Sequence, residues 1–191
     1  KSDRIATRDG YGNALKRMAL ANPNLMVVDG EVSNSTRSQK VLENSKEQFI
    51  EAYIAEQNMV GMALGLSKKG FNVFTSSFGA FLTRAHDQLR MAGLSDPDFT
   101  VCGSHAGVSI GEDGASQMAL EDIAMMRAMP ESTILYPSDG VSAERLTVLA
   151  ASSPGLKYIR TSRPKTPILY DNDETFELGD FKVLKKSSKD K

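Results

Sequence analysis

Short apolar runs alternate with longer segments of helical periodicity along most of the chain, and this alternation restricts the fold more than any other feature. Glycine, proline, asparagine and serine separate the segments. Strands that alternate with helices of about 10–15 residues form βαβ crossovers, which produce parallel sheets. We therefore expect an α/β domain with a mostly parallel central sheet and helices on both faces.

The apolar runs are the predicted strands, and the predicted helices lie between them. Strands are expected over Leu25–Val28, Phe49–Ile54, Phe71–Ser76, Phe99–Gly103, Thr133–Tyr136 and Leu156–Arg160. Helices are expected over Arg8–Leu20, Ser35–Ser45, Ala55–Lys68, Ala80–Ala92 and Gln117–Met129, with a further helix capped by Ser138 and ending near Ala151. Ile168–Tyr170 and Phe181–Leu184 are expected to form short edge strands.

The composition excludes several classes of protein. The chain has 191 residues, of which 23 are basic and 24 acidic, so it lacks the excess positive charge typical of proteins that bind nucleic acid or membrane surfaces. No apolar run approaches the roughly 18 residues of a membrane-spanning helix. One cysteine and two histidines are too few for a four-ligand zinc site or a disulfide framework. We expect a cytoplasmic protein in which Cys102 is a buried, reduced thiol.

The two ends of the chain indicate a larger protein. The sequence begins at Lys1 without a signal peptide, and it ends in the charged run Lys185–Lys191, which is typical of a linker. We expect an internal piece of a longer polypeptide. Its folded domain is predicted over residues 1–170, and an edge strand and charged linker to a following domain are predicted over residues 171–191.

Polar residues follow several of the predicted strands. Glu56, Ser76, His105 and Arg163 each lie in or just after the turn that leaves a strand. In parallel α/β sheets, ligands bind at the carboxyl ends of the strands. We therefore expect the site on this edge of the sheet.

Two sequence motifs are candidates for the chemistry at this edge of the sheet. The glycine-rich stretch Gly107–Gly114 lacks the lysine of a phosphate-binding loop and better fits a tight loop that shapes a pocket. Ser104, His105 and Asp113 are the residue types of a hydrolase triad, but no G-x-S-x-G motif accompanies them. Neither motif predicts the chemistry by itself.

Two predicted helical segments are apolar on nearly every face. These are Met59–Leu66 and Met118–Met126. Burial within this domain and burial against another subunit both explain such a pattern, because a small domain cannot easily cover every face of two helices.

Several short motifs follow one another along the chain. They are Thr7-Arg8, Asp29-Gly30, Asn34-Ser35-Thr36, Tyr53-Ile54-Ala55-Glu56-Gln57-Asn58-Met59, Phe78-Gly79-Ala80-Phe81, Gly103-Ser104-His105, Gly111-Glu112-Asp113-Gly114 and Arg160-Thr161-Ser162-Arg163. Taken in this order, they resemble the pyrimidine-binding domain of the transketolase family, the middle domain of three in those thiamin-diphosphate enzymes. The resemblance covers essentially the whole chain, so the domain over 1–170 is expected to be a pyrimidine-binding domain. Gln117 resembles the animal-type branch of the family.

The resemblance implies a thiamin diphosphate cofactor whose pyrimidine end is bound by Glu56, Phe78 and Phe81, with Glu56 and His105 as the catalytic residues. The cofactor supplies a stabilised carbanion, and its activation needs a carboxyl group that holds a proton near neutral pH. Burial favours the protonated form of a carboxyl group. From the residues alone, Glu56 is equally well an exposed glutamate in the first turn of a helix. Periodicity alone favours ordinary core residues for both phenylalanines.

The resemblance also implies a set of residues that bind a sugar-phosphate substrate. Two guanidinium groups and a hydroxyl suit a phosphate monoester. The resemblance places His105 at the mouth of the same channel and implies that Asp113 and Gln117 bind hydroxyls of the substrate. The set is Arg8, Ser35, His105, Asp113, Gln117 and Arg163.

The family holds Mg²⁺ and the diphosphate through a G-D-G…N motif, which this chain lacks. Val28-Asp29-Gly30 has no leading glycine and ends the first predicted core strand. The resemblance therefore implies that a missing N-terminal domain holds Mg²⁺, that this chain holds no metal, and that a second subunit of a homodimer completes the site. We expect the helix Ala55–Lys68 to lie at that interface, where Gly61 and Gly65 permit close approach.

The function expected first is that of the central domain of a transketolase, which moves a two-carbon ketol unit from a ketose phosphate to an aldose phosphate in the pentose phosphate pathway. The fragment alone is expected to be inactive. One alternative is a related thiamin-diphosphate enzyme, either a deoxyxylulose-phosphate synthase or the β subunit of a 2-oxo acid dehydrogenase. Another is a non-catalytic regulatory or assembly domain that kept the fold.

Overall fold

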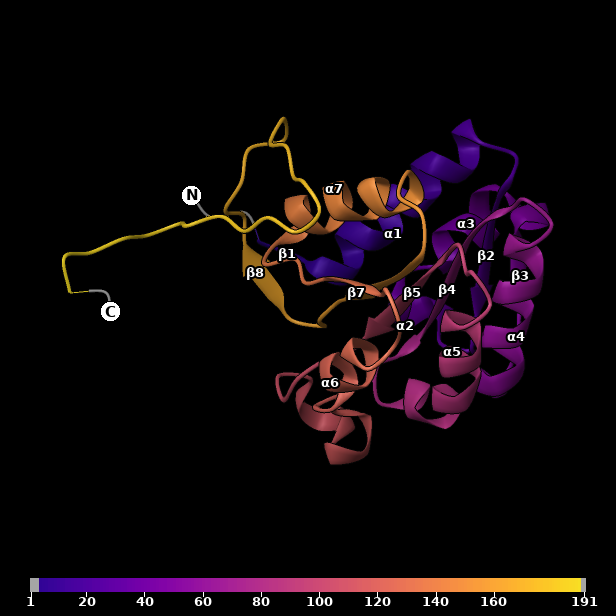
Figure 1. Ribbon diagram of the computed structural model, residues 1–191. Coiled ribbons are helices and arrows are strands. Elements are labelled where there is room, and N and C mark those ends of the chain that lie inside the picture. The colour runs from indigo at the N-terminus through magenta and orange to yellow at the C-terminus, as the bar shows by residue number, and fades with distance from the viewer. Residues whose placement is uncertain (1–3, 190–191) are drawn as a thin grey trace.

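The computed structural model describes residues 4–189 (Figure 1). The first three residues of the domain predicted over 1–170, and the last two of the segment predicted over 171–191, lie outside the described residues.

A six-stranded parallel sheet forms the centre of the molecule, in the order β3-β2-β4-β5-β7-β6. The strands are β2 (Leu25–Asp29), β3 (Phe49–Glu51), β4 (Asn72–Phe78), β5 (Phe99–Ser104), β6 (Thr133–Leu135) and β7 (Leu156–Arg160). The predicted parallel sheet is confirmed, and each strand overlaps the apolar run that predicted it. Continuous apolar runs suit strands that are covered on both faces.

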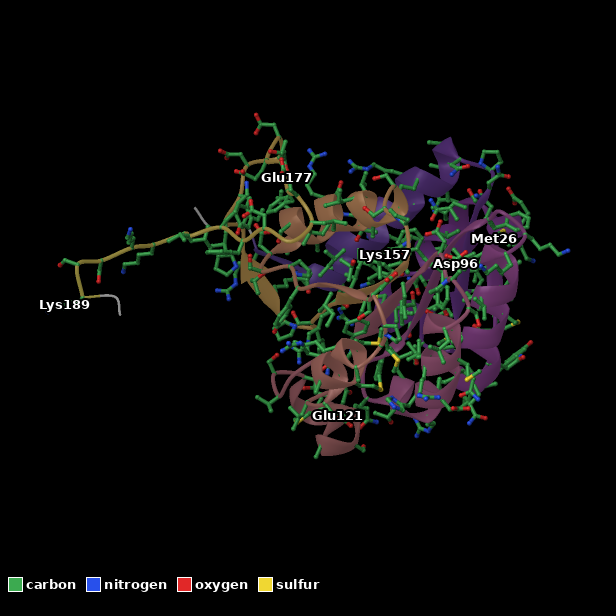
Figure 2. All side chains as sticks on the ribbon, in the orientation of Figure 1. Met26, Asp96, Glu121, Lys157, Glu177 and Lys189 are labelled. Carbon is green, nitrogen blue, oxygen red and sulfur yellow. The ribbon has the colours of Figure 1, made fainter. Side chains whose placement is uncertain are left out.

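Helices cover both faces of the sheet (Figure 1). One face carries α1 (Thr7–Ala21), α3 (Gln39–Asn44) and α7 (Gly140–Ala151), and the other carries α4 (Glu56–Ser67), α5 (His86–Gly93) and α6 (Asp122–Arg127). Tyr11 and Leu15 fill the first layer, and Met59 and Leu89 fill the second. Figure 2 shows side chains packed through both layers. Cys102 lies buried in the first layer, as predicted.

The start of α7 differs from the prediction by one residue. Asp139, not Ser138, caps the helix, because its Oδ1 accepts the backbone N–H of Ser142 at 2.7 Å while the Ser142 hydroxyl accepts from the Asp139 N–H. Such a reciprocal pair satisfies backbone groups that the first helical turn leaves free.

Three predicted helices are broken into shorter pieces. Ser35–Ser45 becomes α2 (Ser33–Thr36) and α3, and Ala80–Ala92 becomes a 3-10 turn, Phe81–Ala85, followed by α5. Gln117–Met129 is wrong as a continuous helix, because the chain forms 3-10 turns over Gly111–Asp113 and Ala115–Gln117 before α6 begins. A further 3-10 turn, Lys46–Gln48, precedes β3.

Two short strands that the sequence did not predict lie beside the main sheet. β1 (Arg4–Ala6) pairs antiparallel with β8 (Lys165–Pro167). The predicted edge strands Ile168–Tyr170 and Phe181–Leu184 are wrong, because neither range is a strand. The chain after β8 runs beside α7 and then extends away from the sheet toward Lys189 (Figure 2).

Candidate functional site

The candidate site lies at the carboxyl ends of the parallel strands, as expected for an open α/β sheet. β4 ends at Phe78, and His105 directly follows β5. Glu56 is the first residue of α4, which follows β3, and Arg163 follows β7. The carboxyl ends of β3, β4, β5 and β7 thus bring these four residues to one edge of the sheet.

Glu56 is buried at the start of α4, with a side chain only 4% exposed. The alternative of an exposed first-turn glutamate is therefore wrong for this residue. Arg84 Nη1 lies 3.5 Å from Glu56 Oε1, and the Arg84 guanidinium also lies 4.9 Å from the centre of the Phe81 ring. The sequence analysis did not single out Arg84, although its spacing of three residues from Phe81 places the two side chains on one side of the 3-10 turn.

Three flat rings form a stack beside Glu56. Phe78 and Phe81 lie 5.0 Å apart between ring centres at an interplanar angle of 18°. Phe78 also stacks on His105, with centres 4.0 Å apart at 14°. Phe78 is buried and Phe81 is half-buried, so part of the second ring faces solvent. The stack connects Glu56, through Arg84, to His105.

His105 is buried and has a left-handed backbone, with φ at 58°. Burial and the neighbouring Arg8 guanidinium lower the pKa of His105 from 6.5 to about 4, so the ring is neutral at pH 7. Arg8 Nη1 lies 3.5 Å from His105 Nε2, and His105 Nδ1 lies 3.0 Å from Ser104 Oγ. Since arginine can only donate, Nε2 accepts and the ring proton sits on Nδ1, where it is donated to Ser104.

Arg8, the second residue of α1, lies between His105 and the loop after β2. Its Nη1 donates to the backbone carbonyl of Ser35 at 3.1 Å, which places Ser35 beside the guanidinium. Burial, followed by the charge of Arg37, lowers the pKa of Arg8. Its Nε–H is buried without a hydrogen-bond partner among residues 4–189. A half-buried guanidinium with an unused donor is suited to bind an acceptor such as an anion.

Arg163 and Asp113 close the other side of the site. Arg163 Nη1 donates to Asp113 Oδ2 at 2.8 Å and to the carbonyl of Ile110 at 2.9 Å. Asp113 Oδ2 also lies 4.0 Å from His105 Nε2. The glycine-rich segment is therefore a loop folded onto the site, where Gly111 (φ 73°) supplies a left-handed turn.

Gln117 is not brought into this set of contacts. Its Oε1 accepts from the neighbouring Ser116 hydroxyl, and the structure gives it no side-chain hydrogen bond to the other candidates among residues 4–189.

A buried ionic cluster, which the sequence analysis missed, anchors the end of the glycine-rich loop. Asp122 is fully buried and accepts from Tyr158 Oη at 2.7 Å and from Arg160 Nε at 2.8 Å. Arg160 also donates to the carbonyl of Ala119 at 3.1 Å. Only the long-range pairing of β7 with the start of α6 brings these residues together, so no local pattern predicts the cluster.

Within residues 4–189, no three His, Cys, Asp or Glu side chains gather in the manner of metal ligands. In the same part of the chain, no helix has both the length and the apolar character needed to cross a bilayer.

Comparisons with known proteins agree on one family. A family profile described as "Transketolase, pyrimidine binding domain" matches residues 3–168. Human transketolase is 51% identical over 189 residues, covering 98% of this chain and 30% of that protein. Bovine transketolase-like protein 1 is 53% identical over 191 residues, covering 100% of this chain and 32% of that protein. The chain thus spans about a third of the length of these relatives.

Solved structures that superpose on this chain are also transketolases. One described as "Split gene transketolase, inactive beta4 tetramer" superposes with a TM-score of 0.86 at 35% identity, covering 96% of this chain and 60% of that one. Transketolase from Leishmania mexicana superposes with a TM-score of 0.81 at 28% identity, covering 87% of this chain and 26% of that one.

Proposed function

The chain belongs to the transketolase family as its pyrimidine-binding domain, and from that premise we propose that it holds the aminopyrimidine end of thiamin diphosphate in a transketolase. The reaction is the transfer of a two-carbon ketol unit from a ketose phosphate to an aldose phosphate. The observation that carries the proposal is the run of contacts from Glu56, through Arg84, to the stacked rings of Phe81, Phe78 and His105.

The residues at this edge fit a flat, polar ring. Glu56 offers a buried carboxyl group, and Phe81 offers a half-buried aromatic ring for contact with the flat ring. The hydroxyl of Ser77, one residue before Phe78, is buried without a partner in the described part of the chain and can bind a further polar atom. When bound, the cofactor supplies stabilisation of a carbanion. Glu56 is proposed to hydrogen-bond the ring nitrogen, and the phenylalanines are proposed to fix the ring plane.

Arg8, Arg163, Ser35 and His105 form the proposed substrate channel. The unused Nε–H of Arg8 and the guanidinium of Arg163 can both donate to a phosphate monoester. Because His105 is neutral at pH 7, it binds as a hydrogen-bonding group and not as a cation. Asp113, held by Arg163, can accept from a sugar hydroxyl. Gln117 is proposed to bind another hydroxyl.

The rest of the cofactor site belongs to other parts of the proposed enzyme. We assign the diphosphate and Mg²⁺ to a domain N-terminal to this one, and residues 171–191 to a linker toward a following domain. The domain over 1–170 then supplies only the pyrimidine end. The compartment we propose is the cytoplasm, where the buried thiol of Cys102 stays reduced.

The second half of the site is proposed to come from the partner subunit of a homodimer. Tyr53 and Ile54, which precede Glu56, are 67% and 77% exposed in the single chain. On α4, Gly61 and Gly65 have open space where a side chain would stand. An apolar, open surface next to a cofactor-binding carboxyl suits packing against a symmetry mate.

The comparisons do not favour the alternatives. The relatives described above are transketolases and a transketolase-like protein, with no synthase or dehydrogenase subunit among them. The split-gene relative, described as inactive in its beta4 form, supports the view that a chain of this kind needs its missing domain for activity.

Glu56→Ala in the full-length enzyme tests the proposal. Turnover is expected to fall by about 10²–10⁴, since the change removes a group that moves a proton during activation. The control is Glu43→Ala, which removes an exposed carboxylate from α3 and should leave turnover unchanged. A Glu56→Ala enzyme within about threefold of wild type would show that Glu56 has another role.

A further inference from the structure

Two bends beside the proposed cofactor site have an unusual backbone. Glu31, after β2, has φ at 64°, and Tyr53, after β3, has φ at 56°. Residues with a side chain rarely adopt this left-handed conformation, because Cβ crowds the following carbonyl oxygen. Such bends persist only where the surrounding structure holds them.

One carboxylate holds both bends. Glu51 Oε1 accepts the backbone N–H of Glu31 at 2.9 Å and the backbone N–H of Tyr53 at 3.0 Å. Glu51 is the last residue of β3 and pairs in register with Asp29, the last residue of β2. Its side chain therefore lies where the two loops separate from the sheet.

The bend at Tyr53 sets the start of the helix that carries Glu56. The Tyr53 carbonyl accepts the N–H of Ala55 at 2.8 Å, and the Ala55 carbonyl accepts the N–H of Met59 at 2.8 Å, which begins α4. A change in the Tyr53 backbone would therefore redirect Ala55 and the Glu56 carboxyl that follows it.

The bend at Glu31 leads to the other part of the site. Val32 donates its N–H to Asp29 Oδ1 at 2.8 Å, and the Val32 carbonyl accepts the N–H of Ser35 at 2.8 Å. Ser35 in turn presents its carbonyl to Arg8. The same carboxylate thus supports the loops that carry both halves of the candidate site.

We propose that Glu51 is a positioning residue of the cofactor site: by accepting the N–H groups of Glu31 and Tyr53, its carboxylate fixes the direction in which α4 presents Glu56. This inference rests on the proposed function, because it takes Glu56 to be the cofactor-binding carboxyl. It extends that function to a residue that touches neither cofactor nor substrate.

The test compares variants of the full-length protein by calorimetric titration with thiamin diphosphate at saturating Mg²⁺. Glu51→Ala is expected to weaken binding by about tenfold, since two hydrogen bonds to a charged acceptor are lost. Glu51→Gln keeps an oxygen that can accept both N–H groups and should stay within about threefold of wild type. Glu47→Ala, which removes an exposed carboxylate just before β3, should match wild type.

Hydrogen exchange supplies a readout that does not depend on turnover or on the cofactor. In the Glu51→Ala protein without cofactor, the backbone amides around Glu31 and Tyr53 should exchange faster than in wild type. Residues of the α1–α7 layer should be unchanged, which separates a local effect from general destabilisation.

The variant Tyr53→Gly tests whether Glu51 acts by holding the left-handed backbone at Tyr53. Glycine adopts positive φ without the Cβ penalty, so the Tyr53→Gly background needs the carboxylate less. Adding Glu51→Ala to Tyr53→Gly should cost about threefold or less in affinity.

Three results would overturn the inference: wild-type affinity in Glu51→Ala, equal losses in Glu51→Ala and Glu51→Gln, or a full tenfold loss in the Tyr53→Gly background. If wild type itself does not bind thiamin diphosphate, the proposed function fails and this inference fails with it. If wild type binds and Glu51→Ala binds equally well, only this inference fails.

Discussion

Single side chains at the candidate site combine burial with uncommon backbone geometry. His105 is 1% exposed and left-handed, stacked on Phe78 and next to the cation of Arg8. Burial and the neighbouring Arg8 charge both disfavour a second proton on the ring. The neutral ring therefore acts through its hydrogen bonds and its flat face at physiological pH.

The lowered pKa of His105 predicts a pH dependence of stability. Between pH 6.5 and about 4, the unfolded chain binds a proton at this residue that the folded chain does not. Stability is therefore full above pH 6.5 and is lost as the pH falls, at about 1.4 kcal/mol per pH unit at most from this group. Urea unfolding of the isolated chain at several pH values should show a shallower loss in His105→Asn than in wild type.

Two features make that comparison specific. Burial raises the pKa of Asp29 to about 6, so Asp29 adds stability as the pH falls below 6, but it does so equally in wild type and variant. The exposed His86 offers a matched variant, His86→Asn, which makes the same chemical change away from the ring stack. Identical slopes for wild type and His105→Asn would show that His105 does not bind its proton more weakly in the folded chain.

At the scale of elements, α1 and α7 pack through glycine. A Cβ at Gly10 would lie 2.2 Å from the backbone carbonyl oxygen of Gly140, a contact that only movement of a helix can relieve. Gly10→Ala should therefore lower the free energy of unfolding of the isolated chain by about 1–3 kcal/mol.

Gly65→Ala is the matched control for this prediction. Gly65 also lies inside a helix, α4, but nothing stands within 4 Å of its added Cβ. Because alanine favours helix, Gly65→Ala should raise stability by about 0.4–1 kcal/mol in the monomeric chain. Urea denaturation measures both variants, and a shift of the same sign in both would contradict the packing account.

The elements that were predictable are those whose signal is local. The parallel strands appear as apolar runs because both faces of each are covered, so Leu156–Arg160 was predicted with its observed bounds. The single helix predicted over Gln117–Met129 is wrong, because the apolar pattern continues through residues that are not helical before α6 begins at Asp122. Asp122 pairs there with Arg160 from β7, a contact that the local pattern does not reveal. The pairing of β1 with β8 joins residues about 160 positions apart, which no periodicity reveals.

The candidate site was predictable to a similar extent. Positions after strand ends predicted that Glu56 and His105 lie at one edge, because topology alone brings them there. The family resemblance, not these positions, singled them out and implied their roles. The contacts of Arg84 and the double acceptor role of Glu51 depend on side-chain geometry across separate loops. They could not be obtained from spacing along the chain.

For the whole molecule, the proposed site requires two subunits to assemble. Ile54 is 77% exposed in the single chain, so a charge there costs little until a partner covers it. In the full-length enzyme, Ile54→Asp should dissociate the proposed dimer and abolish activity together, because an unpaired buried charge is strongly destabilising. Analytical ultracentrifugation and turnover measure the two effects.

Leu20 offers the control for the dimer prediction. It is 62% exposed and lies on α1, on the opposite face of the sheet from α4. Leu20→Asp should leave both the dimer and the activity intact. A dimeric, active Ile54→Asp enzyme would place the interface elsewhere.

The most direct test of the account is a calorimetric titration of thiamin diphosphate into this chain alone and into the full-length protein, each with and without Mg²⁺. The account assigns the pyrimidine end of the cofactor to this chain and the diphosphate and Mg²⁺ to another domain. It therefore predicts tight, Mg²⁺-dependent binding by the full-length protein and weak binding, indifferent to Mg²⁺, by the chain alone. Tight, Mg²⁺-dependent binding by the isolated chain would contradict it.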